Sequence, residues 1–198
     1  MNIPVQKLPG FRKIKELVSK YYENRLIQRV KRSDHLPKHI GIILDGNRRF
    51  AKRKNLSKDK GHILGAEKLE EVLDWAQEIG VKHMTVYAFS KENFQRSSDE
   101  IRALMELFKM KFQEAANDER VHRTGVRLRT IGDISELPDD VVRAIRDAEE
   151  KTKNYTDFSL NIAIGYGGRT ELADAVQKIC EEVERGELSS AEVDESVI

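Results

Sequence analysis

Short apolar segments alternate with longer amphipathic ones along most of this chain, and this alternation limits the folds open to it. Four segments have the length and the β-forming residues of strands, and they cover residues 40–44, 83–89, 126–131 and 158–164. Segments with helical periodicity follow them, at residues 60–79, 97–115, 138–152 and 170–185. Such alternation is typical of a parallel sheet. The sequence therefore predicts an α/β fold, a parallel β-sheet surrounded by helices.

The first apolar run ends in the polar sequence Asp45-Gly46-Asn47-Arg48-Arg49. The run itself has the profile of a strand buried on both faces. Open parallel sheets bind ligands outside the carboxyl ends of their strands, which is where Asp45 falls. Guanidinium groups and backbone N–H groups bind phosphate oxygens, and Mg²⁺ commonly takes one or two carboxylates together with phosphates. The pattern favours a phosphate and magnesium site at Asp45 over a simple turn.

Two more strands end in loops that carry polar groups or glycines. Residues 90–96 supply a hydroxyl, an acid, an amide and an arginine, although Ser97 and Glu100 also form a capping-box pattern for the next helix. Residues 165–169 lack a complete dinucleotide fingerprint, and no Walker phosphate loop is present, so nucleotide chemistry is poorly supported. His62 opens a helix near the first loop, where a capping role and a functional role are equally open.

The N-terminal segment differs in charge from the rest of the chain. Residues 1–38 contain ten Lys and Arg against three acids, whereas the whole chain has a net charge of +1. Apolar residues recur every three to four positions, so we expect a basic amphipathic helix within residues 1–36. Such a helix either lies on an anionic membrane surface or packs its apolar stripe on the domain. Nucleic-acid binding is not expected, because no recognised motif accompanies the charge.

The remaining composition indicates one cytoplasmic domain. The chain has no apolar run of about 18 residues and no signal-peptide core, so no membrane-spanning helix is expected. Its single cysteine, Cys180, falls in an amphipathic helical pattern and cannot form an internal disulfide, and we expect it in the core. Trp75 and Met84 also fit core positions.

Several ordered motifs together give the chain a specific resemblance to the cis-prenyltransferases, the family of the undecaprenyl diphosphate synthases. The resemblance covers residues 37–190 without large gaps. The motifs that carry it are Asp45-Gly46-Asn47-Arg48-Arg49-Phe50, Gly61-His62 with Gly65-Ala66, residues 87–96, Leu104-Met105, residues 126–133, and residues 160–169.

This resemblance implies Mg²⁺-dependent elongation of an allylic diphosphate, farnesyl or geranylgeranyl diphosphate, by isopentenyl diphosphate to give a polyprenyl diphosphate. Asp45 matches the catalytic, Mg²⁺-binding aspartate of the family, and Asn93 matches a catalytic position at which we favour a positioning role, since an amide is a poor base. The positions that match substrate contacts are Gly46, Asn47, Arg48, Arg49, Phe50, Lys58, His62, Ser90, Lys91, Glu92, Phe94 and Arg96. The family is normally dimeric, so a homodimer is expected for the full-length protein, with peripheral membrane contact through the basic helix as one alternative. A dry tunnel for the growing chain is expected along Ala88, Leu104, Met105 and Phe108.

The chain departs from the family pattern at three places. Phe50 and Phe94 stand where tryptophan is common, and Lys58 stands where arginine is common, which keeps the charge but loses the bidentate fork. The chain also stops at Ile198, before the late arginine-rich segment that binds isopentenyl diphosphate in the family. We therefore expect residues 37–198 to form a catalytic domain whose C-terminal part is absent.

Two other functions compete with this interpretation. A haloacid-dehalogenase-like phosphatase would place a second aspartate two residues after Asp45, but Asn47 stands there. A non-catalytic subunit of a heteromeric prenyltransferase tends to lack the aspartate and the arginine-rich turn, and both are present here. A generic α/β binding domain remains the least specific alternative.

Overall fold

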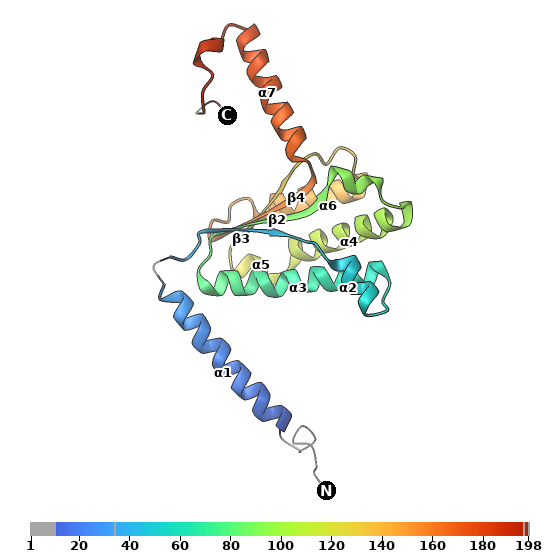
Figure 1. Ribbon diagram of the computed structural model, residues 1–198, viewed down its shortest axis with the longest axis vertical. Helices are drawn as coiled ribbons and strands as arrows, with labels where there is room; N and C mark the ends of the chain where they lie inside the picture. Colours follow the sequence, from blue (N-terminus) through green and yellow to red (C-terminus); the bar gives the residue numbers. More distant parts are fainter. Residues whose placement is uncertain (1–10, 34, 196, 198) are drawn as a thin grey trace.

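The computed structural model describes residues 11–33, 35–195 and 197. Figure 1 shows a central sheet with helices packed around it, and two helices, α1 and α7, that project from this body in opposite directions. The elements in chain order are α1 (Phe11–Lys31), β1 (His39–Ile43), α2 (Asn47–Arg53), α3 (Lys58–Ile79), β2 (His83–Ser90), η2 (Lys91–Gln95), α4 (Ser98–Asn117), α5 (Glu119–Arg123), β3 (Val126–Ile131), α6 (Asp139–Thr152), β4 (Phe158–Tyr166), α7 (Gly168–Glu184) and η3 (Ser190–Glu192).

The sheet has the strand order β1-β2-β4-β3, and every neighbouring pair is parallel. This confirms the predicted parallel sheet surrounded by helices. Because the strands are parallel, their carboxyl ends meet at one edge, and the loops after β1 and β2 lie together there. The strand order reverses between β2 and β4, and open sheets bind ligands at such a reversal.

The core lies around the two central strands. Met84, Val86 and Phe89 of β2 and Ile164 of β4 are almost completely buried, as is Ile145 of α6. Met84 therefore occupies the predicted core position. Apolar side chains on alternate strand positions and on one face of each helix meet there, since burying them is the main favourable contribution to folding.

Helix α6 also protects the outer edge of β3. The backbone N–H of Leu128 donates to Thr152 Oγ1 at 3.0 Å, and the N–H of Thr130 donates to Glu149 Oε1 at 2.6 Å. These are alternate residues on the side of β3 that pairs with no other strand of the described residues. Side chains of α6 thus supply the partners that a further strand would otherwise provide.

The environment of β1 differs from the prediction. A strand buried on both faces was expected, but Ile43 is 72% exposed and burial alternates along the strand. The reason is that β1 is the outermost strand in the order β1-β2-β4-β3, and the described residues cover only one of its faces. The expected loop after β1 is also largely helical, because α2 begins at Asn47.

Two predicted core residues are exposed. Trp75 is 53% exposed on α3, where the ammonium of Lys68 lies 5.9 Å from its ring centroid. Cys180 is exposed on α7, which projects from the body. Helical periodicity indicates which face of a helix is apolar but not whether a neighbour covers it. Among the helices of the described residues, none is long and apolar enough to cross a membrane.

Candidate active site

Asp45 lies directly after β1, at the edge where the strand ends meet. Its Oδ1 accepts a hydrogen bond from the N–H of Gly46 at 2.5 Å, and its Oδ2 accepts one from Arg49 Nη2 at 2.8 Å. Gly46 has φ 92°, a left-handed conformation that favours glycine, and it forms the N-cap of α2. The turn therefore brings a carboxylate and a guanidinium group together, and both side chains are more than 70% exposed.

Helix α2 is held against α3 by glycines. A Cβ atom at Gly61 would lie 2.6 Å from the carbonyl oxygen of Asn47, and one at Gly65 would lie 2.5 Å from Asn47 Oδ1. Only glycine permits this approach, which explains the pair of glycines that sequence analysis singled out. The close packing fixes the position of Asn47 and of the two arginines that follow it.

The segment after β2 forms the short helix η2 rather than an irregular loop. Asn93 Oδ1 accepts a hydrogen bond from the N–H of Ser90 at 3.3 Å, which closes the turn. Lys91 reaches Asp133, after β3, at 3.3 Å. The ring of Phe94 packs edge-on against Phe89, with centroids 4.8 Å apart, so it faces the core.

Glu100, in the first turn of α4, lies close to basic side chains from α2, from α3 and from the segment between η2 and α4. Its carboxylate accepts hydrogen bonds from Arg96 Nη1 at 3.1 Å and from Lys58 Nζ at 3.2 Å. His62 Nε2 and Arg48 Nε lie 3.4 and 3.9 Å from Glu100 Oε1. The predicted capping box is wrong, because Ser97 is the N-cap but its side chain makes no cap hydrogen bond. The side chain of Glu100 contacts these basic side chains instead.

Burial affects the protonation of two residues in this cluster. Desolvation lowers the pKa of His62 below its ordinary 6.5, although the nearby Glu100 carboxylate partly opposes the shift. Burial alone would raise the pKa of Glu100, but the hydrogen bond from Lys58 and the charges of Arg96 and Arg48 outweigh it and lower the pKa. The two shifts thus favour the charged carboxylate of Glu100 and the neutral imidazole of His62.

One cavity of about 830 Å³ begins at this cluster and runs between the sheet, α3 and α4. Its mouth is polar, and the residues that line it are Asp45, Gly46, Asn47, Arg48, Arg49, His62, Ser90, Asn93 and Arg96. Its body is apolar. The side chains along it include Leu69, Leu73, Val86, Ala88, Leu104, Leu107, Phe108, Phe112, Leu160 and Ile162.

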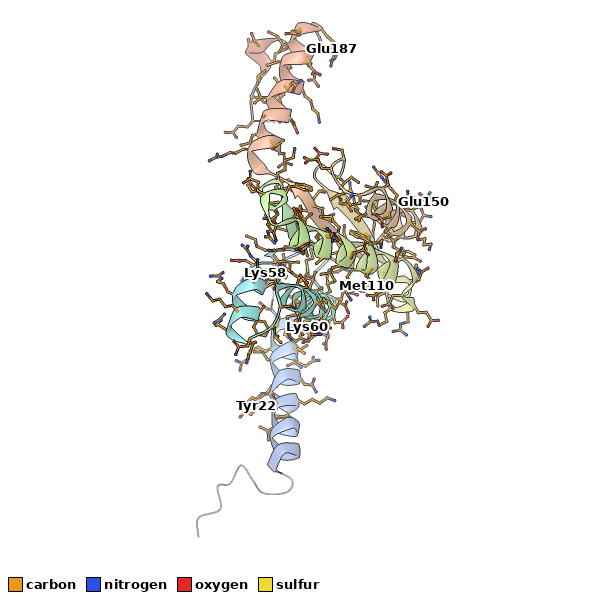
Figure 2. The ribbon with its side chains drawn as sticks, turned by 90° about the vertical axis from the view of Figure 1, so that its right-hand side faces the viewer. Tyr22, Lys58, Lys60, Met110, Glu150 and Glu187 are labelled. Atoms are coloured by element: carbon orange, nitrogen blue, oxygen red, sulfur yellow. The ribbon has the colours of Figure 1, made fainter. Side chains whose placement is uncertain are left out.

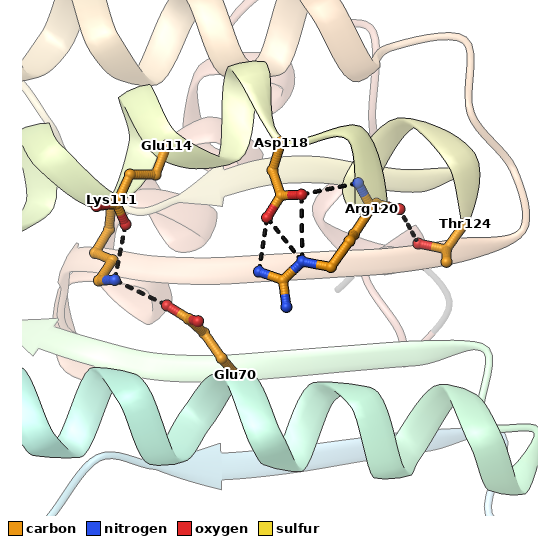
Figure 3. Close-up of polar contacts among 6 residues, drawn as sticks. All are labelled: Glu70, Lys111, Glu114, Asp118, Arg120 and Thr124. Carbon is orange, nitrogen blue, oxygen red and sulfur yellow. Dashed lines mark hydrogen bonds and ion pairs between the residues drawn. The ribbon is translucent and has the colours of Figure 1, made fainter.

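The far end of the cavity is polar again. Lys111 of α4 donates to Glu70 of α3 and to Glu114, each at 2.8 Å, so it links the two helices, as Figure 3 shows. Beside this pair, Arg120 Nη2 donates to Asp118 Oδ2 at 2.7 Å. We call this end of the cavity, with Glu70, Lys111, Glu114, Asp118 and Arg120, the far rim. The far rim was not predicted, because its charged residues have the sequence pattern of an ordinary solvated helix surface.

The structure brings most of the predicted site residues together, but not all. Four lie close by without lining the cavity: Phe50, Lys91, Glu92 and Phe94. Lys58 reaches the site only through Glu100. Of the predicted tunnel residues, Ala88, Leu104 and Phe108 line the cavity, whereas Met105 is buried in the core on another side of α4. Met105 directly follows Leu104, and one residue step rotates an α-helix by about 100°, so the two side chains lie on different sides of α4.

Glu100 was not predicted as a site residue. Its capping-box spacing offered a sufficient local explanation, and nothing in the sequence indicates that it is buried among cations. The only signal was an acid four residues after Arg96, the separation that allows ion pairs on a helix.

The donor groups at the mouth limit the kind of metal that could bind. Among the described residues no cluster of three or more His, Cys, Asp or Glu could hold a metal ion, and Asp45 is the one carboxylate that lines the mouth. A resident structural metal does not fit this set. A magnesium ion that brings phosphate and water ligands with it does fit, because Mg²⁺ often takes only one or two protein carboxylates.

Comparisons with known proteins point to one family. Residues 43–198 match the family model for undecaprenyl diphosphate synthase, a prenyltransferase. The chain is 51% identical over 181 residues to a geranylgeranyl-diphosphate-specific tritrans,polycis-undecaprenyl-diphosphate synthase of Methanocaldococcus jannaschii, covering 91% of this chain and 64% of that protein. A synthase of the same name from Thermococcus kodakarensis is 47% identical, with 89% of this chain and 67% of that protein covered. The chain thus spans about two thirds of the length of these relatives.

A solved structure shares the fold as well. Lavandulyl diphosphate synthase from Lavandula x intermedia, in complex with dimethylallyl diphosphate, has a TM-score of 0.74 at 30% identity and covers 81% of this chain and 68% of its own. The parallel sheet of this chain agrees with this shared fold. This chain belongs to the undecaprenyl diphosphate synthase family of prenyltransferases.

Proposed function

We propose that the protein elongates an allylic diphosphate with isopentenyl diphosphate to give a cis-polyprenyl diphosphate. The observation that carries this proposal is the cavity, which joins a cationic mouth to an apolar body. A prenyl diphosphate has the same two parts, an anionic head and an apolar chain. The names of the relatives favour geranylgeranyl diphosphate as the primer, with farnesyl diphosphate as the alternative.

The turn after β1 would bind the diphosphate of the primer. Gly46, Asn47, Arg48 and Arg49 line the mouth, and His62 and Arg96 lie beside them. Phe50 and Lys58 would support this turn from outside the cavity. The positive groups would stabilise the negative charge that develops on the departing diphosphate, which is where electrostatic catalysis acts.

The segment after β2 would order the second substrate relative to the first. Ser90 and Asn93 line the mouth, and the residues between and beside them are Lys91, Glu92 and Phe94. The turn that joins Asn93 to Ser90 holds the amide in place. Asn93 is assigned a positioning role, because an amide is too weak a base to remove a proton.

Asp45 would hold a magnesium ion that enters with the diphosphate. The ion would neutralise phosphate charge and weaken the bond to the leaving group. In this structure Arg49 donates a hydrogen bond to Asp45 Oδ2. Because both side chains are exposed, the carboxylate could release Arg49 and bind the metal ion instead.

The reaction balances with the groups present. The bond between C1 of the primer and its diphosphate oxygen breaks, and C1 bonds to C4 of isopentenyl diphosphate. The C3 cation that results loses a proton from C2 to form the cis double bond, and the released diphosphate takes up that proton. The apolar walls along Leu104 and Phe108 would exclude water from the allylic cation.

Incorporation of labelled isopentenyl diphosphate into butanol-extractable lipid tests this proposal. The assay uses geranylgeranyl or farnesyl diphosphate and Mg²⁺, with this chain and with a form extended at its C-terminus to the length of the relatives. Activity in either form supports the proposal. Absence of activity in both folded forms, with every primer, would favour a supporting subunit instead.

We further propose that α7 contributes to a homodimer. It projects from the body, and Leu172 and Val176 on it are 64% and 59% exposed. A second copy would bury this apolar strip. Light scattering after size exclusion should give the dimer mass, and Val176→Glu should shift the protein toward monomer.

The basic helix α1 is proposed to make peripheral contact with an anionic membrane. Tyr21, Tyr22 and Leu26 are each at least 60% exposed on it, beside Arg25 and other basic residues. Figure 2 shows Tyr22 on the part of α1 that projects from the body. Co-sedimentation with vesicles containing anionic lipid should fall with added salt and with Leu26→Glu.

A further inference from the structure

Glu100 is the one buried acidic side chain among the residues that the structure describes. Its side chain is only 3% exposed, and it does not line the cavity. Arg48, His62 and Arg96, which surround it, do line the cavity. Glu100 therefore stands behind these groups, on the side away from any bound ligand.

The carboxylate connects elements that are far apart in the sequence. Arg48 comes from α2, Lys58 and His62 come from the first turns of α3, and Arg96 lies between η2 and α4. Their contacts with Glu100 range from 3.1 to 3.9 Å. One side chain thus sets the relative position of the three segments that surround the mouth.

Burial of this charge is not explained by stability alone. Ion pairs that are buried seldom stabilise a fold more than apolar residues of the same shape, because both charges lose their hydration. The cluster also contains three Lys and Arg side chains and a single carboxylate, so positive charge is in excess at the mouth. An excess of this kind suits a site that completes its charge balance with an anion.

We propose that Glu100 is a positioning residue that, anchored by Lys58, holds Arg48 and Arg96 ready for the diphosphate group. The side chains of Arg48 and Lys58 are 54% and 59% exposed, so without an anchor they would sample many rotamers. A ligand would then have to order them on binding, which weakens its affinity. This inference rests on the proposed function of the mouth as a diphosphate site.

The sign of one affinity change tests the proposal. If Glu100 were merely a negative charge near the site, Glu100→Gln would strengthen the binding of an anion. If Glu100 positions the cations, the same substitution weakens the binding of geranylgeranyl diphosphate and of inorganic diphosphate by about tenfold or more. Glu100→Asp, which keeps the charge with a shorter reach, should recover part of the affinity.

Calorimetry on the 198-residue chain, with both probes, measures these affinities. Glu106→Gln is the matched control, because Glu106 lies on the same helix, is 65% exposed and pairs with Lys109 away from the mouth. Its affinities should equal those of the wild type. Binding of geranylgeraniol, which lacks the diphosphate, should be unchanged in Glu100→Gln and so show that the cavity is intact.

The outcomes separate this inference from the proposed function. Equal or tighter diphosphate binding by Glu100→Gln overturns the positioning role, while wild-type binding still supports the site. Failure of the wild type to bind geranylgeranyl diphosphate counts against the proposed function itself. If Glu100→Gln does not fold, Glu100→Asp decides the question. Wild-type diphosphate affinity in Glu100→Asp would also contradict the proposal that Glu100 holds the basic side chains in place.

Discussion

At the scale of single residues, the protonation of the mouth depends on burial. His62 has a lowered pKa, so between that pKa and the ordinary 6.5 the unfolded chain binds a proton that the folded chain does not. The contribution of His62 to folding stability should therefore be fully present above pH 6.5. It should be lost as the pH falls through the pKa that His62 has in the folded state. Urea unfolding at several pH values measures this slope. His62→Gln should reduce it, and an unchanged slope would assign the pH dependence to other groups.

Asp45 provides the second residue-scale prediction. Because its side chain is 72% exposed, Asp45→Ala should change the free energy of unfolding by no more than about 0.5 kcal/mol. Elongation should nevertheless fall by roughly a hundredfold or more, as expected when a group that stabilises developing charge is lost. The measurement is isopentenyl incorporation in an active form of the protein. Retained magnesium-dependent turnover would contradict the assignment of Asp45.

At the scale of elements, the approach of α2 to α3 depends on glycine. Gly61→Ala would place a Cβ atom 2.6 Å from the Asn47 carbonyl oxygen and 2.8 Å from Ala51 Cβ, and neither the backbone nor this short side chain can easily move aside. We expect a loss of about 1–3 kcal/mol in the free energy of unfolding, the usual result of overpacking. Weaker diphosphate binding should accompany it, since α2 carries Arg48 and Arg49.

Gly41→Ala is the control for this prediction. A Cβ atom at Gly41, in β1, would meet nothing within 4 Å, so the substitution should be neutral or slightly stabilising. Denaturant unfolding of both variants makes the comparison. Equal effects at the two positions would show that the contact between α2 and α3 is not as tight as described.

At the scale of the whole molecule, the cavity has an apolar body with polar residues at each of its two ends. Helix α3 lines it from His62 to Gln77, a span of roughly 20 Å at the rise of an α-helix. Lys111 links α4 to α3 near the far end, and its hydrogen bonds to Glu114 and Glu70 raise its pKa despite partial burial. A growing apolar chain would meet this charged rim after crossing the cavity.

Lys111→Met should therefore lengthen the product. The substitution removes the ion pair with Glu70 and replaces an ammonium group by an apolar one, so the rim would resist the chain end less. Chromatography of the dephosphorylated products would measure the length distribution in an active form. Lys109→Met, which alters a lysine on the same helix outside the cavity, is the control. Identical distributions for Lys111→Met and the wild type would contradict this role for the rim.

The sequence alone determined the kind of fold and the edge at which the site lies. Alternation of short apolar segments with helical patterns identified the four strands that the structure describes, and Asp45 directly after the first of them indicated the ligand-binding edge. The resemblance to a known family then supplied most of the residues around the mouth. These features depend on local order along the chain, which periodicity and motif spacing report directly.

The tertiary structure alone decided the strand order, the exposure of Ile43 and Trp75, the far rim at Lys111 and the burial of Glu100. Each depends on groups distant in the sequence, as Glu100 depends on Lys58, 42 residues away. Local spacing gave Glu100 an ordinary capping role, whereas folding removed its water and surrounded it with cations. The physical reason is that burial and charge pairing are properties of packed neighbours, and a linear pattern does not contain those neighbours.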